Sequence, residues 1–318
     1  MIGAGGFIGS HLAENLVEQG AMVRAMVEYN AQGNWGCLES SPVCDELEVY
    51  AGDIRDRDNL QQAMQGMETV FHLAALISIP YSYHAPMSYV RTNVEGTLNV
   101  LQVALELGVE RLIHTSTSEV YGTARYVPID ESHPLQAQSP YSASKISADK
   151  LAEAFHLSFD LPVVTVRPFN TFGPRQSTRA VIPTIIAQCL SGGPVHLGNL
   201  RPTRDLNYVT NIVDGFVQAA SVSEAVGHTI NLGSGREISI GELAELIFRL
   251  IGEPVKIERD KRRLRPDNSE VERLLADNTL ARTLLGWEST VSLEEGLKYT
   301  IEWMREHLDA YRPGVYAL

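Results

Sequence analysis

Apolar residues in the first half of the chain follow two alternating patterns. Short, almost wholly apolar runs predict buried strands, and longer segments with apolar residues three or four positions apart predict helices. The short runs cover residues 23–27, 47–51, 70–75, 111–114 and 163–167. Strands that are apolar on both faces and alternate with helices are typical of a doubly wound parallel sheet, which is an α/β fold.

Two of the predicted helices are long. One covers residues 88–107, and the other begins near Tyr141, after a Ser139-Pro140 start signal, and runs to about residue 159. Proline and glycine then punctuate residues 168–175. This punctuation marks the point where the chain leaves the sheet.

The remaining pattern predicts a second, smaller α+β domain. The sheet domain is expected to hold residues 1–169 and about 207–234, because residues 208–231 return to it. The smaller domain is expected to hold residues 170–206 and about 235–318. Its predicted helices lie near residues 239–251, 278–285 and 293–308.

A glycine-rich turn, Gly3-Ala4-Gly5-Gly6-Phe7-Ile8-Gly9, opens the first helical pattern. Glycines let the backbone approach a pyrophosphate, which lies against the amides at the helix N-terminus. Such a turn should follow a strand, but only Met1 and Ile2 precede it. We therefore expect the true reading frame to begin further upstream.

Tyr141 and Lys145 stand four residues apart on a predicted helix, so they share one face. An unperturbed tyrosine has a pKa of about 10, and a lysine ammonium one turn away is expected to lower it toward neutrality. A hydroxyl from Thr117, after the strand at 111–114, can share a proton with a substrate oxygen. These three groups suit the reversible oxidation of a secondary alcohol.

Composition narrows the class of protein. The formal net charge of −13 argues against nucleic acid or an anionic membrane as the main partner. The cysteines Cys37, Cys44 and Cys189 show no metal-ligand spacing, so we expect free thiols and no metal. No apolar run is long enough to cross a bilayer, and we expect a cytoplasmic protein.

The glycine turn, the Tyr141/Lys145 pair and Thr117 together resemble the extended short-chain dehydrogenase/reductases, specifically the nucleotide-sugar epimerases and dehydratases. The resemblance covers essentially the whole chain and implies a Rossmann domain that binds NAD(P). It implies that Thr117, Tyr141 and Lys145 oxidise C4 of the sugar. It also implies a homodimer, in which the helices beginning near Ser88 and Tyr141 pair across a two-fold axis. The apolar residues that can form this face, or equally pack on the sheet, are Leu98, Leu101, Leu105, Leu151 and Phe155.

The implied cofactor is NAD, with NADP as a second possibility. An acid at the end of the second strand repels a 2′-phosphate and so favours NAD. Glu28 holds this place and can either bind the ribose or face solvent, and Asp53 can contact the adenine or cap a helix near Arg57. The other residues that the resemblance assigns to the cofactor are Gly3, Gly6, Phe7, Ile8, Ile54, Leu73, Ala74, Ala75, Asn93, Tyr141, Lys145 and Pro168.

The residues after Thr117 decide which reaction comes after the oxidation. Once C4 is a ketone, the C5 proton is acidic and a carboxylate can remove it. Glu119 falls on the same side as Thr117 if the segment is extended, and Ser118 can orient the leaving C6 hydroxyl. A 4,6-dehydratase needs this carboxylate, whereas a simple 4-epimerase does not.

Other reactions stay open, because the same Thr-Ser-Glu sequence occurs in UDP-glucuronate decarboxylases. Residues 29–36, 176–183 and 269–274 resemble the 4,6-dehydratases of legionaminic acid biosynthesis, which act on a nucleotide-linked N-acetylglucosamine. We therefore expect UDP- or GDP-N-acetylglucosamine as substrate. The alternatives are a 4-epimerase, a decarboxylase and, from another class, a non-catalytic NAD(P)-binding regulator.

Arginines recur in the loops of the predicted second domain. Fork-shaped guanidinium groups suit diphosphate oxygens. Arg204 and Arg265 match the family's phosphate-binding arginines by position, Asn170 matches a residue that holds the diphosphate, and Arg179 lies in the dehydratase-like stretch 176–183. The substrate's nucleotide is expected at these four side chains.

Overall fold

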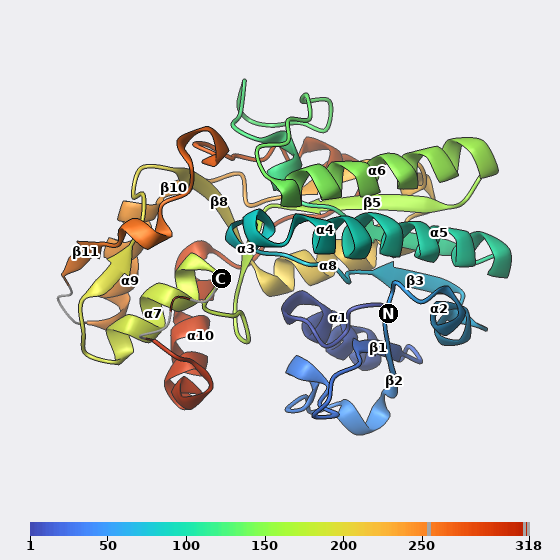
Figure 1. Cartoon of the computed structure of the whole chain (residues 1–318), viewed down its shortest axis with the longest axis horizontal. Helices are drawn as coiled ribbons and strands as arrows, with labels where there is room; N and C mark the ends of the chain where they lie inside the picture. Colours follow the sequence, from blue (N-terminus) through green and yellow to red (C-terminus); the bar gives the residue numbers. More distant parts are fainter. Residues whose placement is uncertain (253–255, 314–315, 317–318) are drawn as a thin grey trace.

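A parallel sheet forms the centre of the computed structural model, which describes residues 1–252, 256–313 and 316 (Figure 1). One group of its strands pairs in the order β2-β1, and the other in the order β3-β4-β5-β9. Every one of these pairs is parallel. The strands are β1 (Arg24–Glu28), β2 (Glu48–Gly52), β3 (Thr69–His72), β4 (Arg111–Thr115), β5 (Val163–Pro168) and β9 (Thr229–Leu232).

Residues 1 and 2 join the two groups of strands. Ile2 forms parallel bridges to Met26 of β1 and to His72 of β3. The amide of Ile2 donates to the carbonyl of Phe71 at 2.8 Å, and the amide of Gly3 donates to that of Met26 at 3.0 Å. Residue 2 thus lies between β1 and β3, at the place where a strand is expected before the glycine turn.

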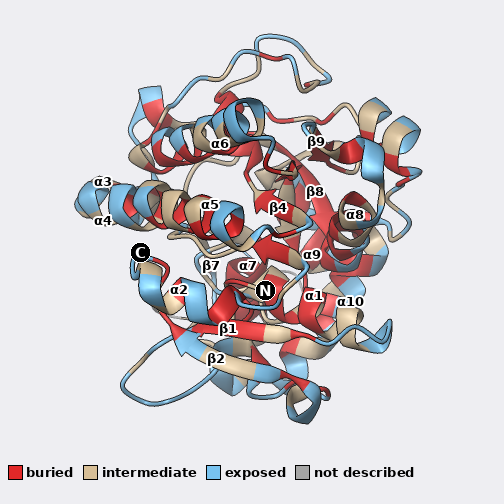
Figure 2. Cartoon of the chain, turned by 90° about the vertical axis from the view of Figure 1, so that its right-hand side faces the viewer, coloured by how far each residue is buried: buried red, intermediate tan, exposed pale blue. Residues whose placement is uncertain are grey.

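Helices cover both faces of the sheet (Figure 2). On one face α2 (Arg57–Met64), α5 (Gly96–Leu107) and α6 (Pro140–Phe159) pack side by side, and on the other α1 (Phe7–Glu18) packs against α8 (Val209–Ser221). Every residue of β5 is buried, as the wholly apolar runs predicted for strands covered on both faces. The prediction of a doubly wound parallel sheet is confirmed.

A smaller α+β part lies beyond the carboxyl ends of these strands (Figure 1). In one small sheet β8 (Thr203–Tyr208) pairs parallel with β6 (Asn170–Phe172) and antiparallel with β10 (Glu237–Ser239). In another β7 (Val195–Leu197) pairs with β11 (Ile257–Arg259). The helices that pack together here are α7 (Val181–Leu190), α9 (Ile240–Ile251) and α10 (Leu293–Glu306).

The predicted helix at 88–107 contains an irregular turn. The segment consists of α4 (Pro86–Tyr89), a π-helix at Val90–Glu95, and α5, and it follows the short helix α3 (Ile79–His84). A π-turn holds one more residue than an α-turn and is frequent at functional sites. The predicted helix at 278–285 likewise contains a π-helix, at Ala281–Leu285. Of the helices in the described part of the chain, none combines the length and the apolar character that crossing a bilayer requires.

Candidate active site

Three adjoining cavities follow the carboxyl edge of the main sheet. We call them the glycine-turn cavity (about 350 Å³), the central cavity (about 370 Å³) and the arginine cavity (about 240 Å³). The first two share Gly3, Gly6, Leu73 and Ala75, and the last two share Glu119, Asn170, Thr171 and Gln176. The cavities therefore form one continuous site that runs from the sheet to the smaller part of the chain.

The glycine turn forms a close-packed backbone cradle. Gly3 has a φ of +89°, and a Cβ atom on it would lie 2.6 Å from the amide nitrogen of Ala74. A Cβ atom on Gly9 would lie 2.3 Å from the carbonyl oxygen of Gly3. Helix α1 begins here with Gly6 as N-cap and without a capping side chain, so its first amides remain available to an anion. This geometry fits the pyrophosphate of a dinucleotide.

Three residues expected near the adenosine of the cofactor line the glycine-turn cavity, but the expected alternative role of one of them, as a helix cap, belongs to another residue. Glu28 and Ile54 line the glycine-turn cavity, although Glu28 is exposed. Asp53 also lines it and forms an ion pair with Arg55, which holds the pKa of Asp53 below its usual value. Asp56, and not Asp53, caps α2, since its side chain accepts from the amide of Asn59.

Asn93 supports the cavity wall without lining the cavity. It is buried in the π-helix, where its side-chain oxygen accepts from the amide of Leu76 at 2.8 Å. Its side-chain nitrogen donates to the carbonyl of Leu76 and to the hydroxyl of Ser144. Asn93 thus ties the loop after β3 to α6. Every other residue expected at the cofactor lines the glycine-turn or the central cavity: Gly3, Gly6, Phe7, Ile8, Glu28, Asp53, Ile54, Leu73, Ala74, Ala75, Tyr141, Lys145 and Pro168.

The five residues expected to be catalytic converge on the central cavity, which is lined by Thr117, Ser118, Glu119, Tyr141 and Lys145. Helix α6 starts with a capping box at Ser139, which places Tyr141 in its first turn and Lys145 in its second. Lys145 is only 3% exposed, and its ammonium donates to the carbonyl of Thr115 at 2.6 Å.

Burial dominates the titration of this cluster. It raises the pKa of Tyr141, while the Thr117 hydroxyl lowers that pKa and the carboxylate of Glu119 raises it. Burial lowers the pKa of Lys145 to about 8, against a smaller upward influence from Asp149. In these side chains alone Lys145 does not bring the pKa of Tyr141 toward neutrality as expected, because removal from water is the largest influence on that pKa and raises it.

Thr117 and Glu119 are brought together by a turn and not by an extended strand. Residues Ser118–Tyr121 form a 3₁₀-helix, and the Thr117 hydroxyl caps it by accepting from the amide of Glu119 at 3.3 Å. The expected alternation of an extended segment is thus wrong, although both side chains still line the central cavity. The Glu119 oxygen Oε2 is buried and has no hydrogen-bond partner in the described part of the protein.

A buried polar network supports α6 from behind. Asp149 accepts from the hydroxyl of Ser116 at 2.6 Å, from Arg167 Nη2 at 2.9 Å, and from His114 Nε2 at 3.1 Å. Despite its burial, these partners lower the pKa of Asp149 to about 2. Asp149 is four residues after Lys145 on α6, so this ionised carboxylate lies on the same helix face as the ammonium.

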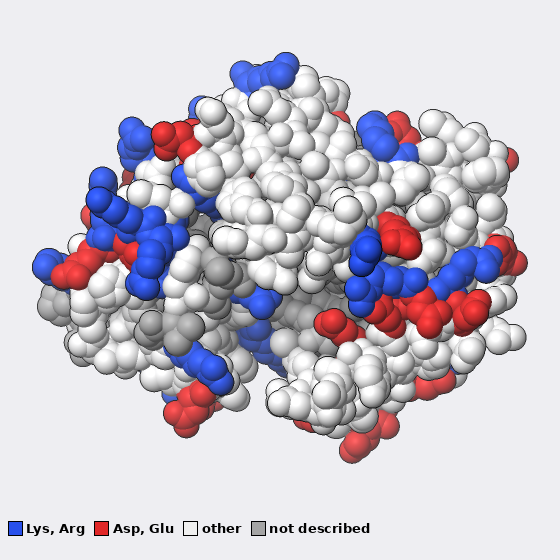
Figure 3. Space-filling view, in the orientation of Figure 1, with Lys and Arg blue, Asp and Glu red and all other residues white. Residues whose placement is uncertain are grey.

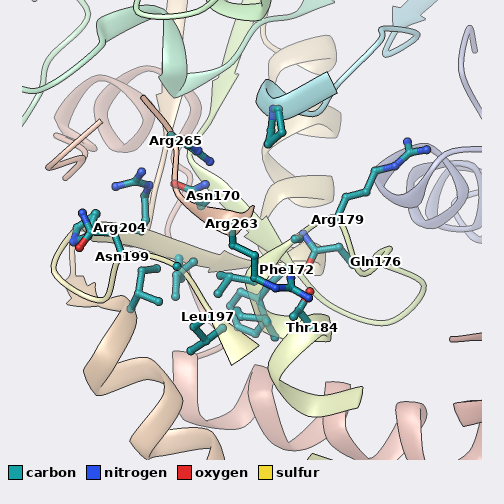
Figure 4. A pocket seen from close by; sticks show the side chains of 18 of the residues that line it. Asn170, Phe172, Gln176, Arg179, Thr184, Leu197, Asn199, Arg204, Arg263 and Arg265 are labelled. Carbon is teal, nitrogen blue, oxygen red and sulfur yellow. The ribbon is translucent and has the colours of Figure 1, made fainter. Parts of the chain in front are cut away.

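The arginine cavity gathers basic side chains from segments far apart in the chain. Its lining includes the four residues expected to bind substrate, Asn170, Arg179, Arg204 and Arg265. In Figure 4, Arg204, Arg265 and Asn170 lie at one end of the cavity, while Arg179 extends away from them. Figure 3 shows basic side chains inside a hollow near the middle of this face of the acidic molecule.

Two further residues of this cavity were not predicted from the sequence. Arg263 lines it with its guanidinium 4.7 Å from the ring centroid of Tyr316, and Glu270 lines it between Arg204 and Arg265. The basic run at residues 261–265, unusual in so acidic a chain, was an available signal for Arg263. Glu270 falls in the dehydratase-like stretch 269–274, but nothing in that stretch indicates its contact with the two arginines.

Comparisons with known proteins find matches that cover nearly the whole chain. A family model described as GDP-mannose 4,6 dehydratase matches residues 1–300. The UDP-glucose 4-epimerase of Mycolicibacterium smegmatis is 34% identical in an alignment of 309 positions that covers 95% of this chain and 97% of that protein. The dTDP-glucose 4,6-dehydratase of Streptomyces griseus is 33% identical in an alignment of 323 positions that covers 99% of this chain and 96% of that protein.

A solved structure shows the same arrangement. DesIV, a dTDP-glucose 4,6-dehydratase from Streptomyces venezuelae with NAD bound, superposes with a TM-score of 0.89 at 29% identity, over 98% of both chains. Epimerases and dehydratases therefore match this chain about equally well. The choice between their reactions rests on the site itself.

Proposed function

Given that the chain belongs to the GDP-mannose 4,6-dehydratase family of nucleotide-sugar dehydratases and epimerases, within the extended short-chain dehydrogenase/reductases, we propose that it is a nucleotide-sugar 4,6-dehydratase. This activity makes it a lyase that removes water across C5 and C6 of the sugar. We propose UDP- or GDP-N-acetylglucosamine as substrate.

The observation that carries the proposal is the carboxylate of Glu119. It lines both the central and the arginine cavity, and its Oε2 is buried without a hydrogen-bond partner among the described residues. A buried acceptor left unpaired is costly unless it has a partner during function. Removal of the C5 proton requires a base beside Thr117, Tyr141 and Lys145, and the carboxylate of Glu119 can act as that base. Epimerisation at C4 does not require such a carboxylate.

The cofactor of the proposed enzyme is NAD. The cradle at Gly3 and Gly9, the free amides of α1 and the residues lining the glycine-turn cavity would hold it. The exposed carboxylate of Glu28 at this cavity favours NAD over NADP by repelling a 2′-phosphate. When bound, NAD supplies the acceptor for the C4 hydride, the later donor to C6, and a positive ring that favours a nearby phenolate.

The proposed roles of the side chains follow the order of the reaction. Tyr141 as phenolate accepts the proton of the C4 hydroxyl, Thr117 hydrogen-bonds the same oxygen, and the Lys145 ammonium stabilises the phenolate. Glu119 then takes the C5 proton and gives it to the C6 hydroxyl, which Ser118 orients and which leaves as water. With the hydride returned to C6, a proton from solvent is added at C5, and the product is a 4-keto-6-deoxy sugar.

Substrate binding is assigned to the second part of the chain. Arg204 and Arg265 are proposed to bind the diphosphate together with Asn170, and Arg179 to contact the substrate from the other end of the cavity. Cofactor binding is accordingly assigned to residues 1–169 and about 207–234. Nucleotide-sugar binding is assigned to residues 170–206 and about 235–318.

The enzyme is further proposed to be a homodimer through α4, α5 and α6. Leu105 is 37% exposed on α5, and Leu157 and Phe159 are exposed at the end of α6. Leu101, for which the sequence left open this face or packing on the sheet, is wholly buried in the core. Sedimentation at micromolar concentration tests the assembly, and a monomer there would exclude it.

Product analysis tests the reaction. UDP- and GDP-N-acetylglucosamine are offered separately with NAD, and each product is examined by mass spectrometry. Loss of one water supports dehydration. A product of unchanged mass would establish epimerisation instead, and release of carbon dioxide from UDP-glucuronate, with no turnover of either acetamido sugar, would establish a decarboxylase.

A further inference from the structure

One carboxylate oxygen is shared by two arginines in the arginine cavity. Glu270 Oε1 lies 3.5 Å from Arg204 Nη2 and 3.4 Å from Arg265 Nη1. Burial lowers the pKa of Arg204, and Glu119 and Glu270 are among the acids that raise it. Two guanidiniums this close need a counter-charge, and within the protein Glu270 supplies it directly.

The contacts of Glu270 differ from those of a structural ion pair in the same molecule. Arg167 reaches Asp149 through two nitrogens, at 2.9 and 3.2 Å, and Asp149 also accepts at 2.6 Å from Ser116. Charge-assisted N–H···O bonds are commonly about 2.7–2.9 Å long. The two contacts of Glu270 are longer than this, and its side chain is 13% exposed against 4% for Asp149. Glu270 is thus held loosely where Asp149 is held firmly.

The backbone around Glu270 is nevertheless well anchored. Its carbonyl accepts from the side chains of Gln138 and Thr123, and its amide donates to the carbonyl of Pro266 at 3.1 Å. The neighbouring Ser269 hydroxyl donates to the carbonyl of Gln138 at 2.5 Å. The side chain of Glu270 can therefore leave the arginines by rotation about its own bonds, without a change in the loop.

We propose that Glu270 is an exchangeable counter-ion which occupies the place of a diphosphate between Arg204 and Arg265 and which the diphosphate of the nucleotide ligand displaces. This inference rests on the proposed function. Each binding event exchanges one anion for another, so Glu270 weakens the affinity for nucleoside diphosphates. It also speeds their release, because the carboxylate returns to the arginines as the ligand departs. Glu270 thereby sets the affinity of the site without touching the sugar.

The test compares Glu270→Gln with Glu272→Gln by calorimetric titration of UDP and of GDP. Gln keeps the size of the side chain and removes its charge. Glu272 also acts on Arg204 through its charge, but it is exposed and forms no ion pair with either arginine in the described part of the chain. Its variant therefore measures the long-range effect of one lost negative charge.

We expect Glu270→Gln to bind the nucleoside diphosphate about tenfold or more tightly than the wild type, since the competing carboxylate is gone. Glu272→Gln should change the affinity by about twofold or less. NAD titration of each variant checks that the protein is folded, and Glu270→Ala serves as a second variant if Gln is not tolerated.

The outcomes separate this inference from the proposed function. Equal or weaker binding by Glu270→Gln and Glu270→Ala, in protein that still binds NAD, would show that Glu270 orients the arginines and would overturn the exchange. Tighter binding of the same size in Glu272→Gln would reduce the effect to general charge and also overturn it. If the wild type binds neither UDP nor GDP, the proposed function itself fails.

Discussion

The glycine-turn cavity and the arginine cavity, at the two ends of the site, differ in the groups that form their surfaces. At the glycine-turn cavity the backbone forms the binding surface, and the glycines matter because a Cβ atom on them would collide with neighbouring backbone. At the arginine cavity the side chains form it, and they include Arg179, Arg204, Arg263 and Arg265, which belong to a loop, a strand and the segment 261–265. The first end offers backbone dipoles to an anion, and the second offers the full positive charges of side chains.

The difference has a consequence for binding. A surface of backbone amides is preorganised and changes little when a ligand arrives, so it suits a cofactor that remains through the reaction. Arginines that share an internal carboxylate can exchange it for a ligand, which suits a substrate that enters and a product that leaves. The side chains proposed to be catalytic line the central cavity, which adjoins both surfaces. The comparison therefore predicts that chemistry, cofactor binding and nucleotide binding can be lost one at a time.

The largest expected effect is the loss of chemistry without loss of either binding surface. Tyr141→Phe removes the phenolic oxygen that is proposed to accept the proton of the C4 hydroxyl and leaves the ring that packs against Tyr89. Turnover should fall by about 10⁴-fold, the upper end of the range for general acid–base groups. NAD and UDP or GDP should bind to this variant within about twofold of the wild type in calorimetry. Turnover near the wild-type rate would remove Tyr141 from the mechanism.

Glu119→Gln should allow the oxidation at C4 and block the dehydration that follows it. The amide keeps the shape of the side chain and loses the base, so dehydration should fall by about 100- to 10,000-fold. Oxidation at C4 precedes the step that needs Glu119, and reduced cofactor should therefore accumulate as near-ultraviolet absorbance in the presence of substrate. In deuterated water the wild type should place deuterium at C5, and the variant should not.

This variant also decides between the candidate reactions. An epimerase would keep its activity after Glu119→Gln and would incorporate no deuterium at C5 in either form. Dehydration by the variant at close to the wild-type rate would mean that the base is another residue.

The backbone-built parts of the molecule were predictable from the sequence. The apolar runs located the strands closely, as at 23–27 against Arg24–Glu28, and 70–75 against Thr69–His72. Residues 73–75 extend beyond the strand because small apolar side chains suit a loop beside a cavity as well as a strand. Periodicity also does not reveal a single inserted residue, so the pattern predicts regular helix where a π-turn holds Asn93.

The parts of the site that side chains form were predictable only where the family resemblance gave the position of the residue. Arg204 and Arg265 were expected in the cavity, but the contact of Glu270 with Arg204 joins residues far apart in sequence, which no local pattern records. The turn at Thr117 was missed for a related reason. Its conformation depends on a hydroxyl capping the amide of Glu119, and the same residues are equally compatible with extended backbone.

Gly3→Ala should weaken binding only at the glycine-turn cavity, where the cofactor is proposed to bind. Gly3→Ala places a Cβ atom 2.6 Å from the backbone of Ala74 and also strains a φ of +89°. The turn must shift, and NAD affinity in a titration should fall by about tenfold or more while UDP or GDP affinity is kept. Gly20→Ala is the control, because Gly20 has a φ of +85° with no heavy atom within 4 Å of the added Cβ. Unchanged NAD affinity in Gly3→Ala would show that the turn is not the cofactor cradle.

A matching change should weaken only the other end. Arg204→Lys keeps the positive charge and loses the planar fork, so the KM for the nucleotide sugar should rise by about tenfold. NAD affinity should not change. Arg201→Lys is the control, since Arg201 is exposed and does not line the described cavity. A rise in KM that is equal in both variants would mean that the geometry of the buried guanidinium is irrelevant to binding.

The smallest effects are expected at Asp53 and Asp56, two aspartates three residues apart beside the glycine-turn cavity. One should contribute to NAD binding and the other to the stability of the fold. Asp53→Ala removes a cavity-lining carboxylate whose ion pair with Arg55 is about half exposed, and such pairs add little stability. It should weaken NAD binding by about two- to tenfold and leave the denaturation midpoint unchanged. Asp56→Ala removes the N-cap of α2 and should lower the free energy of unfolding by about 1 kcal/mol with NAD affinity intact. Urea denaturation and NAD titration of both variants measure the four quantities. If Asp53→Ala were the destabilising change, the carboxylate would serve the fold, and side chains would contribute less to the cofactor surface than its backbone does.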